Sequence, residues 1–282
     1  MKTMNITPVT NHREREKGVI VYPVYSRRSA GLSIGINLFP AKKNCQFDCP
    51  YCEVFPFSGK AEFSLEQMEE DLRCAIINAK ERNIPIKDIC FSGNGEPTIS
   101  PAFKDAFKLA EKIHSQEAGL MKIASTKIVI ITNGAGLLQN DIFSFLKDAA
   151  ANSSVDIWLK ADAGTSDWYQ KINRCALQYE KLIEKIKEFA GCAPVTIQTM
   201  LCAVNGEAPS EAEAAAWENL VCELAANGRA SVRKIQLYGK ARPSPEDPLA
   251  SILPEEYLNK RAALLCEAFI KENILTPVEV YI

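Results

Sequence analysis

Short runs of β-branched and other apolar residues alternate along the chain with longer stretches in which apolar residues recur every three to four positions. The first pattern predicts buried strands and the second predicts amphipathic helices. We expect six strands, at residues 33–40, 86–92, 127–132, 155–161, 195–202 and 232–238. We expect the helices that follow them at 65–82, 102–116, 139–150, 177–190, 211–227 and 254–271, and an edge strand in the closing TPVEVYI.

Strands that alternate with helices are typical of a parallel sheet covered by helices. A closed barrel of this kind normally uses eight strand–helix units, and a doubly wound open sheet is the competing architecture. We therefore expect an α/β fold, a partial (β/α)6 TIM-like barrel of parallel strands with a short C-terminal helix–strand extension. No repeat or linker divides the chain, so we expect a single domain over 1–282, with extensions at 1–30 and 241–282 around a core at 31–240.

The composition is that of an ordinary soluble globular protein, with 33 basic and 35 acidic residues and a net charge of −2. This balance does not support nucleic-acid binding by the chain as a whole, although RNA as a partner stays open. The first residues contain no apolar run typical of a secretory signal, and no segment is apolar enough to cross a membrane. A cytoplasmic location without membrane contact is expected.

Ten cysteines in a reducing compartment point to metal ligation or burial rather than to disulfides. Cys45, Cys49 and Cys52 follow the first strand with the spacing C-x3-C-x2-C. Three thiolates on a [4Fe–4S] cluster leave one iron open for another ligand. Structural zinc is the alternative, but it needs a fourth ligand, and the chain has two histidines and no second C-x2-C pair. The other seven cysteines lie in apolar stretches and are expected to be buried.

Polar residues follow the predicted strands where their carboxyl ends would build a site. The turn GNGE covers Gly93, Asn94, Gly95 and Glu96. These residues could bind a ligand, and the alternative is that they only form the turn from a strand to a helix. Asn133 could also bind a ligand, and its alternative role is to begin a helix. Lys160 and Asp162 could face a ligand as well, and their alternative is a solvated ion pair. Polar residues inside the last two strands are expected to bind a ligand or to bond to one another, namely Gln198, Thr199, Gln236 and Tyr238.

The C-x3-C-x2-C motif, with Tyr51 just before its last cysteine, resembles the radical S-adenosylmethionine (SAM) superfamily. GNGEPT resembles the motif that binds the SAM amino group in that superfamily, and ITNG after the third strand is also similar. The resemblance implies that Cys45, Cys49 and Cys52 hold a [4Fe–4S] cluster whose fourth iron SAM chelates. It also implies cofactor contacts from the GNGE residues, and further candidates are Tyr51, Asn133, Lys160 and Asp162.

The same resemblance implies reductive cleavage of SAM to a 5′-deoxyadenosyl radical, with an electron donor such as flavodoxin or ferredoxin. Three segments, SRRSAGLSIGINLFP, GNGEPT and LYGKARPSP, resemble bacterial relatives of the tRNA wybutosine-synthesis enzyme. That enzyme has three further cysteines upstream for a second cluster, and no cysteine precedes Cys45 here. The substrate therefore stays unassigned, with wyosine-type tRNA modification as one alternative. Two alternatives to an enzyme also stay open, a zinc-stabilised binding module and a catalytically silent scaffold of the same fold.

Overall fold

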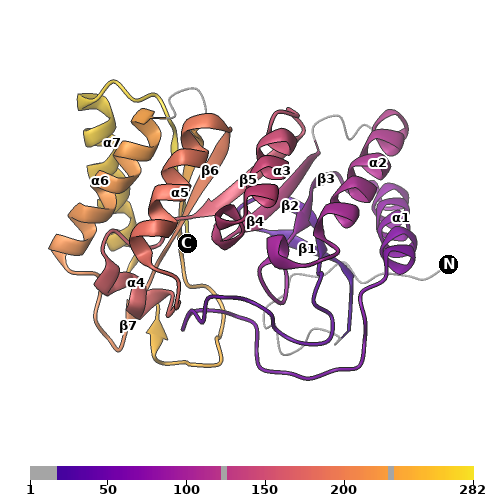
Figure 1. Ribbon diagram of the computed structural model, residues 1–282, viewed down its shortest axis with the longest axis horizontal. Helices are drawn as coiled ribbons and strands as arrows, with labels where there is room; N and C mark the ends of the chain where they lie inside the picture. Colours follow the sequence, from indigo (N-terminus) through magenta and orange to yellow (C-terminus); the bar gives the residue numbers. More distant parts are fainter. Residues whose placement is uncertain (1–17, 122–125, 228–231) are drawn as a thin grey trace. The chain divides into compact units, whose positions relative to one another are not determined.

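The computed structural model describes residues 18–121, 126–227 and 232–282 (Figure 1). Its contacts divide the chain into two compact units. Unit 1 takes its described residues from Met1–Cys45, Pro56–Ile131 and Asn152–Asp156. Unit 2 contains Gln46–Phe55, Thr132–Ala151 and Ile157–Ile282. The cysteine motif therefore passes from unit 1 to unit 2 directly after Cys45.

The strands of unit 1 pair in the order β1-β2-β3-β4. Their bounds are β1 Val21–Ser26, β2 Gly31–Ile36, β3 Ile86–Phe91 and β4 Lys127–Thr132. β1 is antiparallel to β2, whereas β2 with β3 and β3 with β4 are parallel. The long helices α1 (Leu65–Glu81) and α2 (Phe103–Met121) pack against each other, and the 3-10 turn η2 (Pro97–Ile99) precedes α2.

Helix α1 shows how the local sequence determines an element of unit 1. The Ser64 hydroxyl accepts a hydrogen bond from the Gln67 backbone N–H at 3.2 Å, which satisfies one of the unpaired donors at the helix start. Met68, Leu72 and Ala75 recur at helical spacing and are buried. The cap and the apolar face together account for a helix that begins at Leu65, as predicted.

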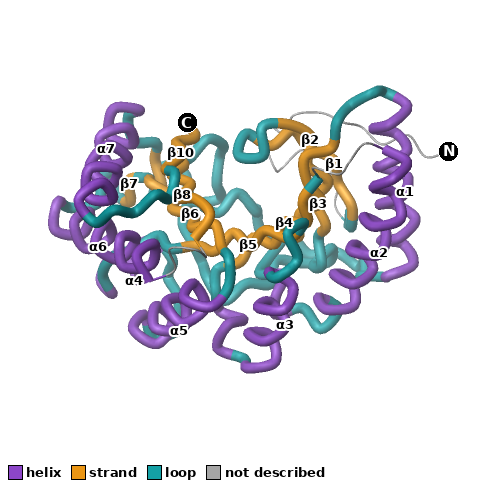
Figure 2. The backbone as a smooth tube through the Cα atoms, turned by 90° about the horizontal axis from the view of Figure 1, so that it is seen from above, coloured by secondary structure: helices purple, strands orange, loops and turns teal. Residues whose placement is uncertain are grey.

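Four parallel strands in the order β5-β6-β8-β10 belong to unit 2, apart from the first two residues of β5. Their bounds are β5 Val155–Lys160, β6 Val195–Leu201, β8 Val232–Gly239 and β10 Val278–Tyr281. The short strands β7 (Ala203–Val204) and β9 (Ala250–Ser251) form a separate antiparallel pair. The helical elements are η3 Ala135–Leu138, α3 Asn140–Ala150, α4 Ser166–Ile172, α5 Tyr179–Cys192, α6 Glu211–Asn227 and α7 Glu255–Lys271. Figure 2 shows α5, α6 and α7 on the outer side of β6 and β8.

The six predicted strands and the edge strand near the C-terminus are present, and the α/β class is confirmed. Strand β1 is a strand that the apolar pattern does not predict, and it lies within residues 1–30. Pro23 interrupts its apolar run, but a proline is tolerated in an edge strand, which is where β1 lies. Helix α4 was also missed, since its seven residues are too few to show helical periodicity. The predicted division into one core and two extensions stays a prediction.

No helix among the described residues has the length and apolar character needed to cross a membrane.

Candidate functional site

The GNGE turn follows β3 in unit 1 and is held by the segment that follows β2. Gly93 has a φ of 117°, and a Cβ there would lie 2.9 Å from the Cβ of Asn37, so glycine is required. The Asn94 backbone N–H donates to Asn37 Oδ1 at 3.1 Å, and Asn94 Nδ2 donates to the Phe39 carbonyl at 3.1 Å. Side-chain amides on both segments therefore fix the turn.

The same turn is paired with the residue that precedes the first motif cysteine. The Asn44 backbone N–H donates to the Asn94 carbonyl, and the Glu96 N–H donates to the Asn44 carbonyl, both at 2.9 Å. Gly95 lies between these bonds, and a Cβ on it would be 1.9 Å from the Asn44 carbonyl oxygen. The predicted SAM-binding turn and the start of the predicted cluster-binding loop are thus neighbours within unit 1.

Glu96 is 2% exposed and caps η2. Its Oε1 accepts hydrogen bonds from the Thr98 backbone N–H at 3.1 Å and from the Thr98 hydroxyl at 2.6 Å. The GNGE residues therefore form a turn from strand to helix, which is the alternative expected for this motif. A contact between the Glu96 carboxylate and SAM stays a prediction.

Asn133 and Gly134 follow β4 and begin η3. Asn133 is buried, and its Oδ1 accepts a hydrogen bond from the Ala135 backbone N–H at 2.9 Å. Gly134 has a φ of 82°, a conformation that favours glycine. The helix-initiating role is confirmed, while a direct ligand role for Asn133 stays a prediction.

Asp162 is the centre of a buried polar cluster in unit 2, and its side chain is 0% exposed. Its Oδ2 accepts hydrogen bonds from the Tyr51 hydroxyl at 2.5 Å and from Asn173 Nδ2 at 2.9 Å. Its Oδ1 accepts from the Met200 backbone N–H at 2.9 Å, and the Lys160 ammonium lies 3.1 Å from Oδ2. Four donors therefore engage this carboxylate, as a buried charge requires.

Lys160 is nearly as buried as its partner, with 13% of its side chain exposed. Its ammonium donates to the Tyr238 hydroxyl at 2.7 Å and lies 5.0 Å from the centre of the Tyr51 ring. Burial acts to lower the pKa of Lys160, but the charge of Asp162 and the contact with Tyr238 outweigh it, so the pKa lies above its usual value. The expected alternative of a solvated ion pair is wrong, because aromatic rings from other segments cover the pair.

The second and third motif cysteines lie in unit 2. The Cys52 N–H donates to the Cys49 carbonyl at 3.0 Å, which closes a turn, and Asn173 Nδ2 donates to Cys49 Sγ at 3.5 Å. Burial raises the pKa of the Cys49 thiol to about 11, against the opposing effect of the Lys160 charge. Burial and the nearby Asp162 charge also raise the pKa of the Tyr51 hydroxyl, which keeps it a proton donor.

The fit to an iron–sulfur cluster rests on the chemistry of the donors. Cys45, Cys49 and Cys52 are thiols, they are partly exposed, and one loop carries all three. Thiolates are the ligands that iron–sulfur clusters take from proteins. Among the described residues, no three His, Cys, Asp or Glu side chains are grouped as they would be around a metal ion. The donor set fits a cluster, and the ligand roles stay predictions.

The remaining cysteines only partly match the expectation of burial. Cys90, Cys175 and Cys202 are buried, and Cys74 and Cys222 are partly buried. The expectation is wrong for Cys192 and Cys266, which are exposed. Cys192 is the last residue of α5, and Cys266 lies on α7, where only one face of the helix is buried. A small residue is tolerated at such solvent-facing positions.

The polar residues inside the strands of unit 2 form hydrogen bonds within that unit. Gln198 Nε2 donates to Gln236 Oε1 at 2.6 Å, and the Thr199 hydroxyl donates to the Ala161 carbonyl at 2.8 Å. Tyr238 completes the set through its contact with Lys160. The internal bonds that were one of the two expectations are therefore present, and ligand binding by these residues stays a prediction.

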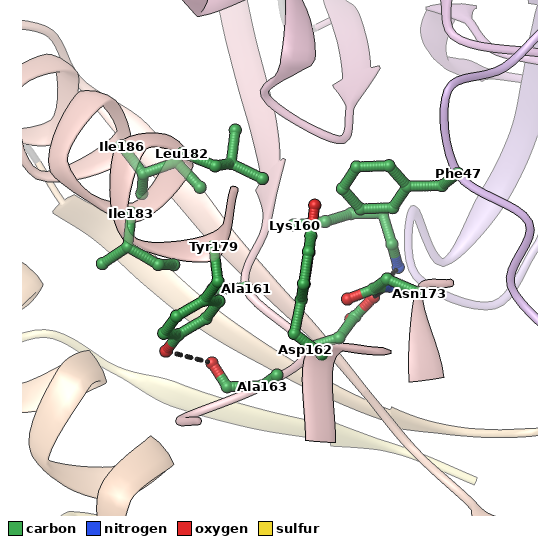
Figure 3. A pocket seen from close by; sticks show the side chains of 11 residues that line it. Phe47, Lys160, Ala161, Asp162, Ala163, Asn173, Tyr179, Leu182, Ile183 and Ile186 are labelled. Carbon is green, nitrogen blue, oxygen red and sulfur yellow. Dashed lines mark hydrogen bonds and ion pairs between the residues drawn. The ribbon is translucent and has the colours of Figure 1, made fainter. Parts of the chain in front are cut away.

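A small pocket lies beside the Asp162 cluster in unit 2 (Figure 3). On one side it is lined by polar residues, among them Lys160, Asp162 and Asn173, and on the other by apolar side chains of α5 such as Ile186. The Tyr179 hydroxyl donates to the Ala163 carbonyl at 3.1 Å and helps to hold the loop after β5. Asn173 is a polar residue of this site that the sequence does not predict, since a single asparagine after a short helix gives no pattern.

No family model matches the chain. A "UPF0026 protein" of Helicobacter pylori strain 26695 is 35% identical over 141 residues, which cover 48% of this chain and 41% of that protein. The protein of the same description from strain J99 is 32% identical over 136 residues, which cover 46% of this chain and 39% of that protein. The matched part of the chain therefore spans about two fifths of the length of these curated relatives.

Several solved structures share the fold. Streptococcus suis SuiB bound to S-adenosylmethionine has a TM-score of 0.63 at 12% identity, covering 87% of this chain and 50% of that chain. A radical SAM methyltransferase from Sphaerobacter thermophilus has a TM-score of 0.62 at 18% identity, covering 89% and 66%. A spore photoproduct lyase mutant with dinucleoside spore photoproduct has a TM-score of 0.55 at 11% identity, covering 98% and 81%. The chain therefore has the α/β fold of radical SAM enzymes, which confirms the predicted fold class.

Proposed function

We propose that this chain is a radical SAM enzyme in which Cys45, Cys49 and Cys52 hold one [4Fe–4S] cluster. The observation that carries the proposal is the pairing of Asn44 with the GNGE turn on a fold shared with radical SAM enzymes. Two motifs that the superfamily uses for the cluster and for SAM are thereby neighbours, although they lie far apart in the sequence. A structural zinc site would not require the GNGE turn to lie beside the cysteine loop.

When bound, the cluster would supply one electron for reductive cleavage of SAM, and the protein would bind the cofactor and exclude water. Gly93 and Gly95 would keep the turn packed against Asn37 and Asn44. The Glu96 carboxylate would accept hydrogen bonds from the SAM amino group. A one-electron donor such as flavodoxin or ferredoxin would reduce the cluster. The substrate is not assigned, and wyosine-type tRNA modification stays one alternative.

The buried polar cluster of unit 2 would contribute mainly by orientation. Four donors engage Asp162, so its carboxylate is suited to fixing Tyr51 and the motif loop in place. Lys160 would place a positive charge near Cys49, where this charge partly offsets the burial that raises the pKa of the thiol. A thiolate is the form of cysteine that binds iron.

Anaerobic reconstitution with iron and sulfide tests the proposal. We expect about four iron atoms per chain, absorbance near 400 nm, and 5′-deoxyadenosine when SAM and dithionite are added. Cys49→Ala should lose the cluster, whereas Cys192→Ala, which changes an exposed cysteine on α5, should keep it. Bound zinc without a cluster would show a zinc-stabilised module instead. A cluster without SAM cleavage would show a silent scaffold.

A further inference from the structure

We propose that Asn173 is a positioning residue of the cluster site, which holds the motif loop by its backbone and donates a hydrogen bond to the Cys49 sulfur. The inference rests on the proposed function, because it concerns the cluster that Cys49 would bind. It adds a residue that lies outside the cysteine motif and outside the SAM-binding motifs.

Asn173 contacts the loop in two ways. Its backbone carbonyl accepts a hydrogen bond from the Asp48 N–H at 3.0 Å, and its Nδ2 lies 3.5 Å from Cys49 Sγ. The residue is 2% exposed and follows α4 directly, with its own N–H bonded to the Tyr169 carbonyl at 2.9 Å. One rigidly held residue therefore fixes both the main chain before Cys49 and the side chain of Cys49.

The orientation of the Asn173 amide is set by Asp162. An ionised carboxylate only accepts hydrogen bonds, so the amide nitrogen must face Asp162 Oδ2, which lies at 2.9 Å. The same nitrogen is thereby directed to the Cys49 sulfur. The Tyr51 hydroxyl donates to the same carboxylate oxygen at 2.5 Å, so Asp162 joins two residues of the motif to Asn173.

A donor at this place has a defined consequence for a bound cluster. Hydrogen bonds to the sulfur atoms of an iron–sulfur cluster stabilise its more negative, reduced state and are one of the factors that set its potential. Residues that bond to metal ligands also fix the geometry of the site, and their loss typically weakens metal affinity about 10- to 100-fold. Loss of the Asn173 amide should therefore make the cluster harder to reduce and easier to remove.

The test compares full-length wild type, Asn173→Ala and Asn173→Asp after anaerobic reconstitution. The readouts are the midpoint potential, followed by electron paramagnetic resonance, and the rate of iron loss to a chelator. The control is Lys171→Ala on α4, the helix that precedes Asn173, because the Lys171 side chain is 55% exposed and lies 3.8 Å from the exposed Glu207 carboxylate.

We expect Asn173→Ala to lose iron at least about ten times faster than wild type and to have a more negative potential. Asn173→Asp keeps the shape of the side chain but places a carboxylate beside Asp162 and Cys49, so its potential should shift in the same direction. Lys171→Ala should match wild type. If Asn173→Ala does not fold, as judged by circular dichroism, Asn173→Asp decides the question.

The inference is overturned if a folded Asn173 variant has the potential and the iron-release rate of wild type. That result would leave the proposed function intact, because the wild-type protein would still hold its cluster. If the wild-type protein itself binds no cluster, the proposed function fails first.

Discussion

A methyl group at Gly95 should break the contact that anchors the start of the cysteine loop. The added Cβ would lie 1.9 Å from the Asn44 carbonyl oxygen and 2.7 Å from its carbon. Both are backbone atoms, so no side-chain rotation relieves the clash, and the two segments must separate. Separation breaks two backbone hydrogen bonds of 2.9 Å, which join Asn44 to Asn94 and to Glu96.

The expected cost of Gly95→Ala follows from these two bonds. A hydrogen bond contributes about 0.5–1.5 kcal/mol to stability, so the free energy of unfolding should fall by about 1–3 kcal/mol. With an m-value of about 2 kcal/mol/M, the urea midpoint should fall by about 1 M. Circular dichroism of the metal-free protein in urea measures this change. Iron uptake during reconstitution should fall as well, because Asn44 directly precedes Cys45.

Gly59→Ala is the matched control in unit 1. A Cβ there would lie 3.4 Å from the Ala41 carbonyl oxygen, which is an ordinary van der Waals contact, and Gly59 needs no positive φ. Its unfolding midpoint should stay within about 0.3 M of wild type. The reasoning about the Asn44 contact is refuted if Gly95→Ala unfolds at the same midpoint as Gly59→Ala.

Three further outcomes are expected. Asp162→Ala should lower the free energy of unfolding by about 3–5 kcal/mol, because it leaves Lys160 buried without its counter-charge, and a loss below about 1 kcal/mol would contradict the buried pair. Burial raises the pKa of Asp88 above its ordinary value of 3.8. The contribution of Asp88 to stability is therefore complete at pH values below 3.8 and is lost as the pH rises through the folded-state pKa. Urea titrations should therefore show wild type losing stability relative to Asp88→Asn as the pH rises, and a constant difference would count against the raised pKa. Iodoacetamide should modify the exposed Cys192 well before the buried Cys90, whose pKa is raised by burial. Mass spectrometry after partial labelling measures the order, and faster modification of Cys90 would contradict this expectation.

The strands and helices of this chain are largely predictable because each is long enough to show its period. Strand β4 and helix α6 begin and end where the apolar pattern does. Strand β1 was missed because Pro23 is compatible with a strand only at a sheet edge, and the position of an edge is a property of the assembled sheet. The same limit applies to the short strands β7 and β9, which have two residues each.

The site was predictable only where one short segment contains the whole signal. The cysteine spacing and the glycines of the GNGE turn are such signals, and the spacing of two between Lys160 and Asp162 correctly indicated a pair. Their burial was not predictable, because Tyr51 and Tyr238, which cover the pair, come from distant segments. Asn173 was not predictable for the same reason, since its partners Asp48 and Cys49 are more than a hundred residues away.

The contacts around the motif explain why loss of a ligand can be separated from loss of structure. Asn44 and Asp48 are held by backbone hydrogen bonds, to the GNGE turn in unit 1 and to Asn173 in unit 2. Neither set of bonds uses a cysteine side chain. Cys49→Ala therefore removes a sulfur whose hydrogen bond from Asn173 contributes about 0.5–1.5 kcal/mol, while the loop keeps its backbone anchors. A Cys49→Ala protein that unfolds like wild type but holds no iron would therefore have lost a ligand. Gly95→Ala, in contrast, should lose stability and iron together, because it moves the backbone that places the first cysteine.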